Sequence, residues 1–115
     1  MTPEKIARFF DSLISLTKSG RLTWERCSPI EVLAFPDTDT SRSFYARFND
    51  GLFFILSKPK YNSISFKLRA TEDAVFTQIG EENDSAILRL YNIIYSQFPS
   101  TESLIDSIID EASDE

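Results

Sequence analysis

The chain of 115 residues contains no histidine. Histidine is the side chain most often used for proton transfer near neutral pH, and it is the commonest ligand of transition metals. Its absence excludes Ser-His-Asp and Cys-His catalytic sites. Because the chain also has a single cysteine, Cys27, the usual structural zinc sites and an internal disulfide are excluded. A lone cysteine fits a reducing compartment, and we expect Cys27 to be a buried structural thiol.

Glycine is scarce, and no long hydrophobic run occurs. The three glycines, Gly20, Gly51 and Gly80, are isolated, so no glycine-rich phosphate-binding loop can form. The longest apolar run covers residues 52–56, whereas a helix that spans a bilayer needs about 20 apolar residues. The first residues lack the basic and apolar segments of a signal peptide. We therefore expect a cytoplasmic protein without a membrane segment, a metal ion or a cofactor.

The residues that are present predict one small domain with helices at both ends. Hydrophobic residues make up 42% of the chain and include ten Phe, which suffices for one core in residues 1–115. Residues 2–19 form the first expected helix, because Thr2 can cap it and Pro3 suits its first position. Apolar residues recur at helical spacing again from Ile87 to Phe98, where Pro99 ends the pattern. A last helix, capped by Ser100 or Thr101, has a stripe of Leu104, Ile105, Ile108, Ile109 and Ala112.

Between these helices the pattern changes to that of β-strands. Short strands are expected at 22–27, 43–48, 52–57, 63–69 and 74–79. The turn Asn49-Asp50-Gly51 favours a hairpin, because these residues tolerate the positive φ of tight turns. Residues 52–57 are apolar on both faces, which is typical of a central strand. The sequence thus predicts an α+β fold with an N-terminal helix, an antiparallel β-meander of four to five strands and two C-terminal helices.

Residues 16–25, Leu-Thr-Lys-Ser-Gly-Arg-Leu-Thr-Trp-Glu, carry the pattern T-x-x-G-x-L-x-W directly after the first helix. This segment resembles one found in small uncharacterised bacterial and phage-borne proteins with a helix, a β-meander and a C-terminal helical part. The resemblance carries no activity over to this chain. The occurrence of such proteins in mobile elements implies roles such as immunity protein, antitoxin or host-takeover factor. The same residues also have a purely structural interpretation, in which 17–20 end a helix and Leu22 and Trp24 face the core.

Charge is distributed unevenly along the chain. Residues 1–79 contain 11 Lys and Arg against 9 Asp and Glu, whereas residues 80–115 contain one against nine. Like charges four residues apart destabilise an isolated helix by roughly 0.2–0.5 kcal/mol per pair, and anions are unfavourable near a helix C-terminus. Four acids recur at four-residue spacing in the last expected helix and form an acidic column along one side of it: Glu102, Asp106, Asp110 and Asp114. We expect this acidic column to bind a basic surface on a protein partner, and a solvated acidic tail is the simpler alternative.

The central strands carry a second feature, a surplus of cations interleaved with aromatic residues. Residues 42–69 contain six Lys and Arg and one acid. Such a face can stack bases and hold phosphates, so a single-stranded nucleic-acid-binding module is an alternative function. The sequence pI of about 4.6 argues against it. Two further alternatives are that an acidic C-terminal helix covers this face, or that a homodimer pairs the two surfaces. The face is expected to contain Tyr45, Arg47, Phe53, Ile55, Lys67 and Arg69.

The function expected from these patterns is binding rather than catalysis. The remaining candidates for chemistry are carboxylates in turns, such as Asp37 with Asp39, and such pairs are common in solvated loops. We therefore expect a non-enzymatic protein-binding factor of the immunity, antitoxin or inhibitor kind. The partner-binding residues are expected on the acidic column and on the basic sheet face. A nucleic-acid-binding module and a dimeric accessory protein of a mobile element are the alternatives.

Overall fold

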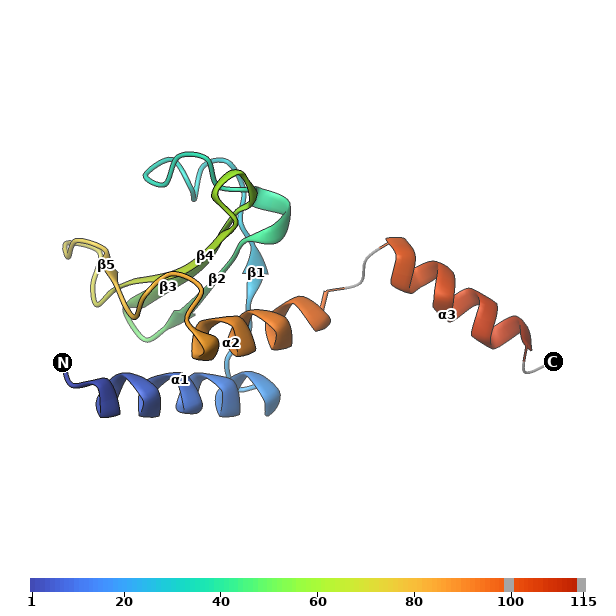
Figure 1. Ribbon diagram of the computed structural model, residues 1–115, viewed down its shortest axis with the longest axis horizontal. Coiled ribbons are helices and arrows are strands. Elements are labelled where there is room, and N and C mark those ends of the chain that lie inside the picture. The colour runs from blue at the N-terminus through green and yellow to red at the C-terminus, as the bar shows by residue number, and fades with distance from the viewer. Residues whose placement is uncertain (99–100, 114–115) are drawn as a thin grey trace.

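The computed structural model describes residues 1–98 and 101–113, and within the last helix it describes side chains from residue 104 onward. The predicted α+β fold is confirmed, with one helix, a five-stranded antiparallel meander and two further helices (Figure 1). The layout that the resemblance implies is therefore present. The helices are α1 (Pro3–Lys18), α2 (Ser85–Ser96) and α3 (Thr101–Ser113). The strands are β1 (Glu25–Arg26), β2 (Phe44–Phe48), β3 (Gly51–Lys58), β4 (Ser63–Arg69) and β5 (Thr77–Gln78).

The segment 16–25 ends α1 and fixes the chain that leaves it. Gly20 has φ +76°, and the N–H groups of Gly20 and Arg21 donate to the carbonyls of Thr17 and Leu16. This is the Schellman arrangement, in which a left-handed residue after the helix satisfies its last carbonyls. The buried Trp24 Nε1 then donates to Thr17 Oγ1 at 3.0 Å. The structural interpretation of the pattern is confirmed, although residues 22–24 precede the two-residue strand β1 rather than form part of it.

The sheet has the strand order β1-β2-β3-β4-β5, so each strand pairs with its neighbour in sequence. The two edge strands have two residues each, shorter than the expected 22–27 and 74–79. The central strand β3 is buried along most of its length, as its apolar sequence predicts. Asn49, with φ 53°, belongs to the β2–β3 turn, where Phe48 pairs with Gly51. The hairpin turn is thus where the sequence predicts it.

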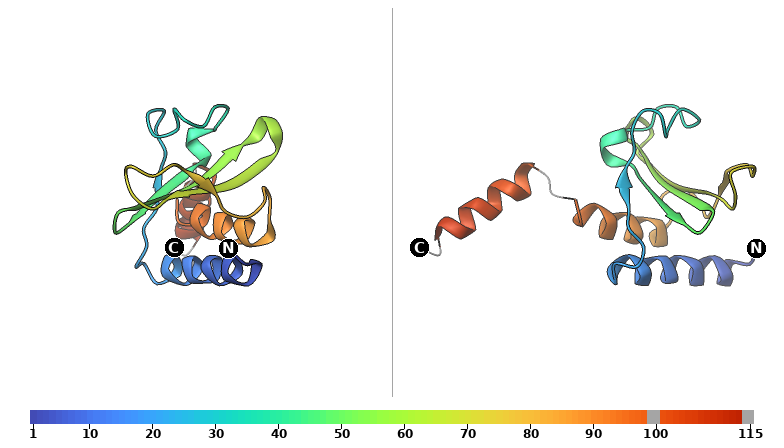
Figure 2. Two further views of the ribbon diagram at one scale, coloured as in Figure 1. Left: turned by 90° about the vertical axis from the view of Figure 1, so that its left-hand side faces the viewer. Right: turned by 180° about the vertical axis from the view of Figure 1, so that it is seen from behind.

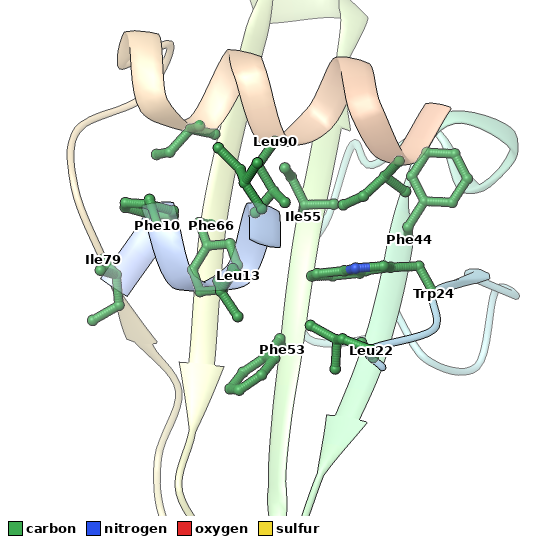
Figure 3. Close-up of a cluster of buried hydrophobic side chains, with 14 residues drawn as sticks. Phe10, Leu13, Leu22, Trp24, Phe44, Phe53, Ile55, Phe66, Ile79 and Leu90 are labelled. Atoms are coloured by element: carbon green, nitrogen blue, oxygen red, sulfur yellow. The ribbon is translucent and has the colours of Figure 1, made fainter. Parts of the chain in front are cut away.

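Helices α1 and α2 lie together on one face of the sheet and form the main core with it (Figures 1 and 3). The rings of Phe10 and Phe66 meet edge to face at 5.2 Å, and both side chains are fully buried. From α2, Ile87, Leu90 and Ile94 are likewise fully buried. We call this side of the sheet the inner face.

The opposite, outer face is covered by the irregular segment 27–39 and by Phe76. These elements form a second, smaller cluster in which Phe35 and Phe76 pack on Phe54 of β3. The strand register corrects one expectation. Tyr45, Arg47, Lys67 and Arg69 pair across β3 with Phe54 and Leu52, so they share the outer face. Phe53 and Ile55 belong to the inner core, because neighbouring residues of a strand point to opposite faces.

Helix α3 lies apart from the rest of the molecule and covers neither face of the sheet (Figures 1 and 2). It extends from the end of the domain at which α1 and α2 terminate, and it contributes much of the 54 Å long axis. Because α2 packs on the inner face and α3 on neither, the expectation that one of the acidic C-terminal helices covers the basic sheet face is wrong. We refer to residues 1–98 as the body.

Candidate functional site

The exposed apolar stripe of α3 is the most unusual surface in the described chain. Its four large aliphatic side chains are each between 51% and 60% exposed. Residues three and four apart lie on the same side of a helix, so these side chains form one continuous stripe. In a water-soluble helix such a stripe normally faces a core. The stripe consists of Leu104, Ile105, Ile108 and Ile109.

The acidic column lies on the same helix. Asp106 and Asp110 are exposed and, four residues apart, are separated by about 6 Å along the helix axis. Within the part of the chain whose side chains are described, no ion pair joins them to a cation; the ion pair found there is Arg42 with Asp39 at 3.8 Å. Glu102 lies on α3, and its side chain is outside the described set. Asp114 lies outside the described residues.

The helix boundaries reveal how the charge is divided between the two parts of the molecule. Residues 1–98 contain 12 Lys and Arg and 12 Asp and Glu, so the body has no net charge. The entire net charge of −6 comes from residues 99–115, which contain six acids and no cation. A division at residue 80 instead counts Glu81, Glu82 and Asp84 with the C-terminal part, although these acids belong to the body. Net negative charge and an uncovered apolar stripe thus coincide on one element.

The basic residues of the outer face are largely engaged within the body. Lys67 Nζ donates to Gln78 Oε1 at 2.8 Å, and the Arg69 guanidinium lies 5.0 Å from the centre of the Phe76 ring. Tyr45 donates its hydroxyl hydrogen to Glu25 at 2.6 Å, and this hydrogen bond raises the pKa of Tyr45. Arg47 is exposed. The predicted residues therefore share a face, but they do not present an open platform of rings.

Cys27 is buried at the edge of the outer cluster, as expected from the sequence. Desolvation by burial, with a further contribution from the charge of Glu31, raises the pKa of its thiol to about 12. The reactive form of cysteine is the thiolate, which this environment disfavours. Cys27 is therefore a packing residue in this fold.

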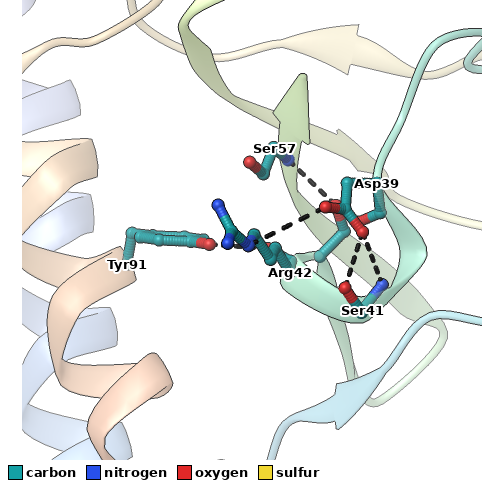
Figure 4. Close-up of polar contacts among 6 residues, drawn as sticks. Asp39, Ser41, Arg42, Ser57 and Tyr91 are labelled. Atoms are coloured by element: carbon teal, nitrogen blue, oxygen red, sulfur yellow. Dashed lines mark hydrogen bonds and ion pairs between the residues drawn. The ribbon is translucent and has the colours of Figure 1, made fainter. Parts of the chain in front are cut away.

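A polar network ties the short helix before β2 to α2 (Figure 4). Tyr91 donates its hydroxyl hydrogen to the carbonyl of Arg42 at 2.7 Å, while Asp39 accepts from the backbone N–H and the hydroxyl of Ser41. Burial raises the pKa of Tyr91, which keeps the phenol protonated as a donor. Arg42 and Tyr91 also border a cavity of about 510 Å³. In this network the polar groups are directed at each other, so its role in the fold is structural.

A groove at the base of α3 escaped the sequence analysis. Its volume is about 430 Å³, and Lys18 contributes a cation to its edge. Arg21, which follows Gly20, is exposed beside it, and the Arg26 guanidinium lies 5.3 Å from the centre of the Phe98 ring. No local pattern links these segments, because they are some 70 residues apart in the chain. We call it the neck groove; it is lined by Thr17, Lys18, Gly20, Leu22, Thr23, Trp24, Gln97 and Phe98.

In the described residues, no group of three or more Cys, Asp or Glu side chains is placed to hold a metal ion. No described helix combines the length and the apolar character needed to cross a membrane. Comparison of the chain with protein-family models, curated proteins and solved structures finds no match.

Proposed function

We propose that this protein is a non-catalytic binding factor that docks α3 on another protein, in the manner of an inhibitor, immunity protein or antitoxin. One observation carries the proposal: α3, which contains four acids and no cation, also leaves its apolar stripe uncovered. Burying an aliphatic side chain stabilises a complex by roughly 1.5–3 kcal/mol relative to leaving it exposed. A helix with four such side chains in one stripe is a ready ligand for a groove.

The chemistry of α3 defines the surface that it would fit. The groove of the partner has an apolar floor for Ile105 and Ile108 and a basic rim for Asp106 and Asp110. Charge of this kind raises the rate of encounter and selects the partner, while the apolar contacts supply most of the affinity. Proteins that bind nucleic acids carry basic grooves, and an inhibitor of such a protein would cover one. The resemblance of residues 16–25 to proteins of mobile elements is consistent with such a role.

The test is affinity capture from the host cell with three versions of the full chain. The variant Ile105→Gln/Ile108→Gln replaces two apolar side chains of the stripe by glutamine, a residue that favours helices. The control Ile30→Gln/Leu33→Gln makes the same change at two exposed apolar residues of the body. A partner that supports the proposal is captured by the wild type and the control, and lost with the α3 variant. A partner retained by the α3 variant would contradict it.

A second measurement examines the charge. With the purified partner, Asp106→Asn/Asp110→Asn should slow association and reduce its dependence on salt, with a smaller effect on dissociation. Association rates that are equal for the variant and the wild type at low salt would remove the acidic column from the proposal. Single-stranded nucleic acid is tested in parallel by gel shift at physiological salt. The outer face gives nucleic-acid binding no specific support, because Lys67 and Arg69 already contact groups of the body.

A further inference from the structure

The surface that α3 needs, an apolar floor with a basic rim, is present on this chain itself at the neck groove. Leu22, Trp24 and Phe98 supply apolar lining, Lys18 lines the edge, and the Arg26 guanidinium lies over Phe98. A third cation, the exposed Arg21, stands in the chain between Gly20 and Leu22, which both line the groove. Residues 17–26 contain one acid, Glu25, which already accepts the hydrogen bond of Tyr45. The groove is thus complementary to the acidic end of α3 in both charge and polarity.

The stripe of α3 cannot fill this groove of its own chain. Phe98 lines the groove, and α3 begins at Thr101, only three residues later. Reversal over so short a connection would lay α3 back along α2, as in an αα-hairpin, and not across the groove at the end of α2. In the structure α3 extends away from that end (Figures 1 and 2). An α3 helix that reaches the neck groove would therefore come from another molecule.

We infer that two copies of this chain form a two-fold dimer in which their α3 helices pair antiparallel. The two apolar stripes bury each other, and each helix C-terminus reaches the neck groove of the other copy. Asp110 and Glu111, in the last turn of α3, then lie near the Lys18 and Arg21 of the second molecule. The arrangement separates the two acidic helix ends and gives each a basic surface.

Length and area favour reciprocal docking over a single contact. A helix of 13 residues is about 20 Å long, so an antiparallel pair places each helix end beside the start of the other helix. A stable interface buries about 800 Å² per partner, more than one narrow helix stripe provides. Reciprocal docking uses the stripe and the groove of both copies, and a two-fold contact closes without further assembly. The dimer uses the same stripe as the proposed function, so the two binding events exclude each other.

The first test is sedimentation equilibrium of the full chain over a range of concentrations. The wild type should dimerise, and Ile105→Gln/Ile108→Gln should raise the dissociation constant about 100-fold or more, because each copy loses two buried aliphatic side chains. The matched control Ile30→Gln/Leu33→Gln should dimerise as the wild type does. A wild type that is monomeric at every concentration overturns the inference, and so does a dimer that the α3 variant leaves intact.

A charge exchange tests the reciprocal geometry. Lys18→Glu/Arg21→Glu reverses the rim of the neck groove, and Asp110→Lys/Glu111→Lys reverses the end of α3; all four residues are exposed. Each variant alone should dimerise about ten-fold or more weakly than the wild type, because like charges meet at both ends. An equimolar mixture should restore the dimer, since each end then meets its opposite. Failure of the mixture to restore it overturns the antiparallel arrangement.

The outcomes separate this inference from the proposed function. A strictly monomeric wild type that still captures a foreign partner through α3 would overturn the dimer and leave the proposed function standing. A dimer that depends on α3, together with partner capture that does not depend on it, would contradict the proposed function alone.

Discussion

Helices α2 and α3 follow each other in the chain, have similar lengths of 12 and 13 residues, and carry the same kind of aliphatic stripe. In α2 the residues Ile87, Leu90 and Ile94 are completely buried, whereas in α3 the corresponding side chains are more than half exposed. The difference is that α2 has α1 and the sheet to pack on. The same amphipathic periodicity therefore occurs in a buried helix and in an exposed one, so it does not show whether the molecule itself covers the stripe.

The largest expected contrast between the two helices comes from deleting the same atoms in each. Ile94→Ala should lower the free energy of unfolding by about 2–5 kcal/mol, because it leaves a cavity in the main core. Ile109→Ala should change it by no more than about 0.5 kcal/mol, since the side chain is already exposed. Urea denaturation of both variants measures this. A large loss of stability with Ile109→Ala at low protein concentration would mean that α3 packs on its own body.

A smaller effect is expected at the point where the body meets the base of α3. Thr17→Val removes the acceptor of the buried Trp24 N–H and should cost about 1–3 kcal/mol. Thr17→Ser keeps the hydroxyl and should cost less, and Thr23→Val, at an exposed position nearby, should have little effect. Equal stabilities for the Val and Ser variants at position 17 would show that the hydrogen bond does not hold this segment in place.

The smallest expected effect concerns pH and the second cluster of the body. Burial raises the pKa of Cys27 from 9.0 to about 12, so the folded state retains a proton that the unfolded state loses. Stability is therefore complete below pH 9 and falls as the pH rises toward 12, by roughly 1.4 kcal/mol at pH 10. Cys27→Ala should lack this component, whereas tyrosine ionisation affects both proteins equally. Urea denaturation of both proteins between pH 7 and pH 10 measures how the free energy of unfolding depends on pH. The same dependence in both would show that the Cys27 thiol is exposed to solvent.

Most of the fold could be predicted from local patterns. Thr2, Pro3 and Gly20 mark the ends of α1, and Asn49 and Gly51 mark the hairpin. The assignment of Phe53 and Ile55 to the outer face was wrong. Because β3 is apolar on both sides, alternation alone cannot assign its residues to a face, and the register with β2 and β4 decides it. The outer cluster packs residues of β3 against the irregular segment 27–39, which has no periodicity that predicts its position.

The candidate site was predicted only in part. Asp106 and Asp110 follow from spacing alone, because four residues on a helix bring side chains to one side. The exposure of Ile105 and Ile108 could not be foreseen, since their pattern is equally that of a buried helix. The neck groove joins residues from both ends of the body, and single-sequence reasoning has no means of placing Trp24 beside Phe98.

An uncharged body with every surplus charge at one end makes this molecule a long electric dipole. A positively charged surface exerts a torque on such an object, so the molecule turns its C-terminal end forward before contact is made. At physiological ionic strength the field reaches only about 8 Å, so the turning occurs in the last moments of approach. Productive collisions are then favoured by orientation as well as by attraction. A uniformly acidic protein of the same net charge would be attracted but not oriented.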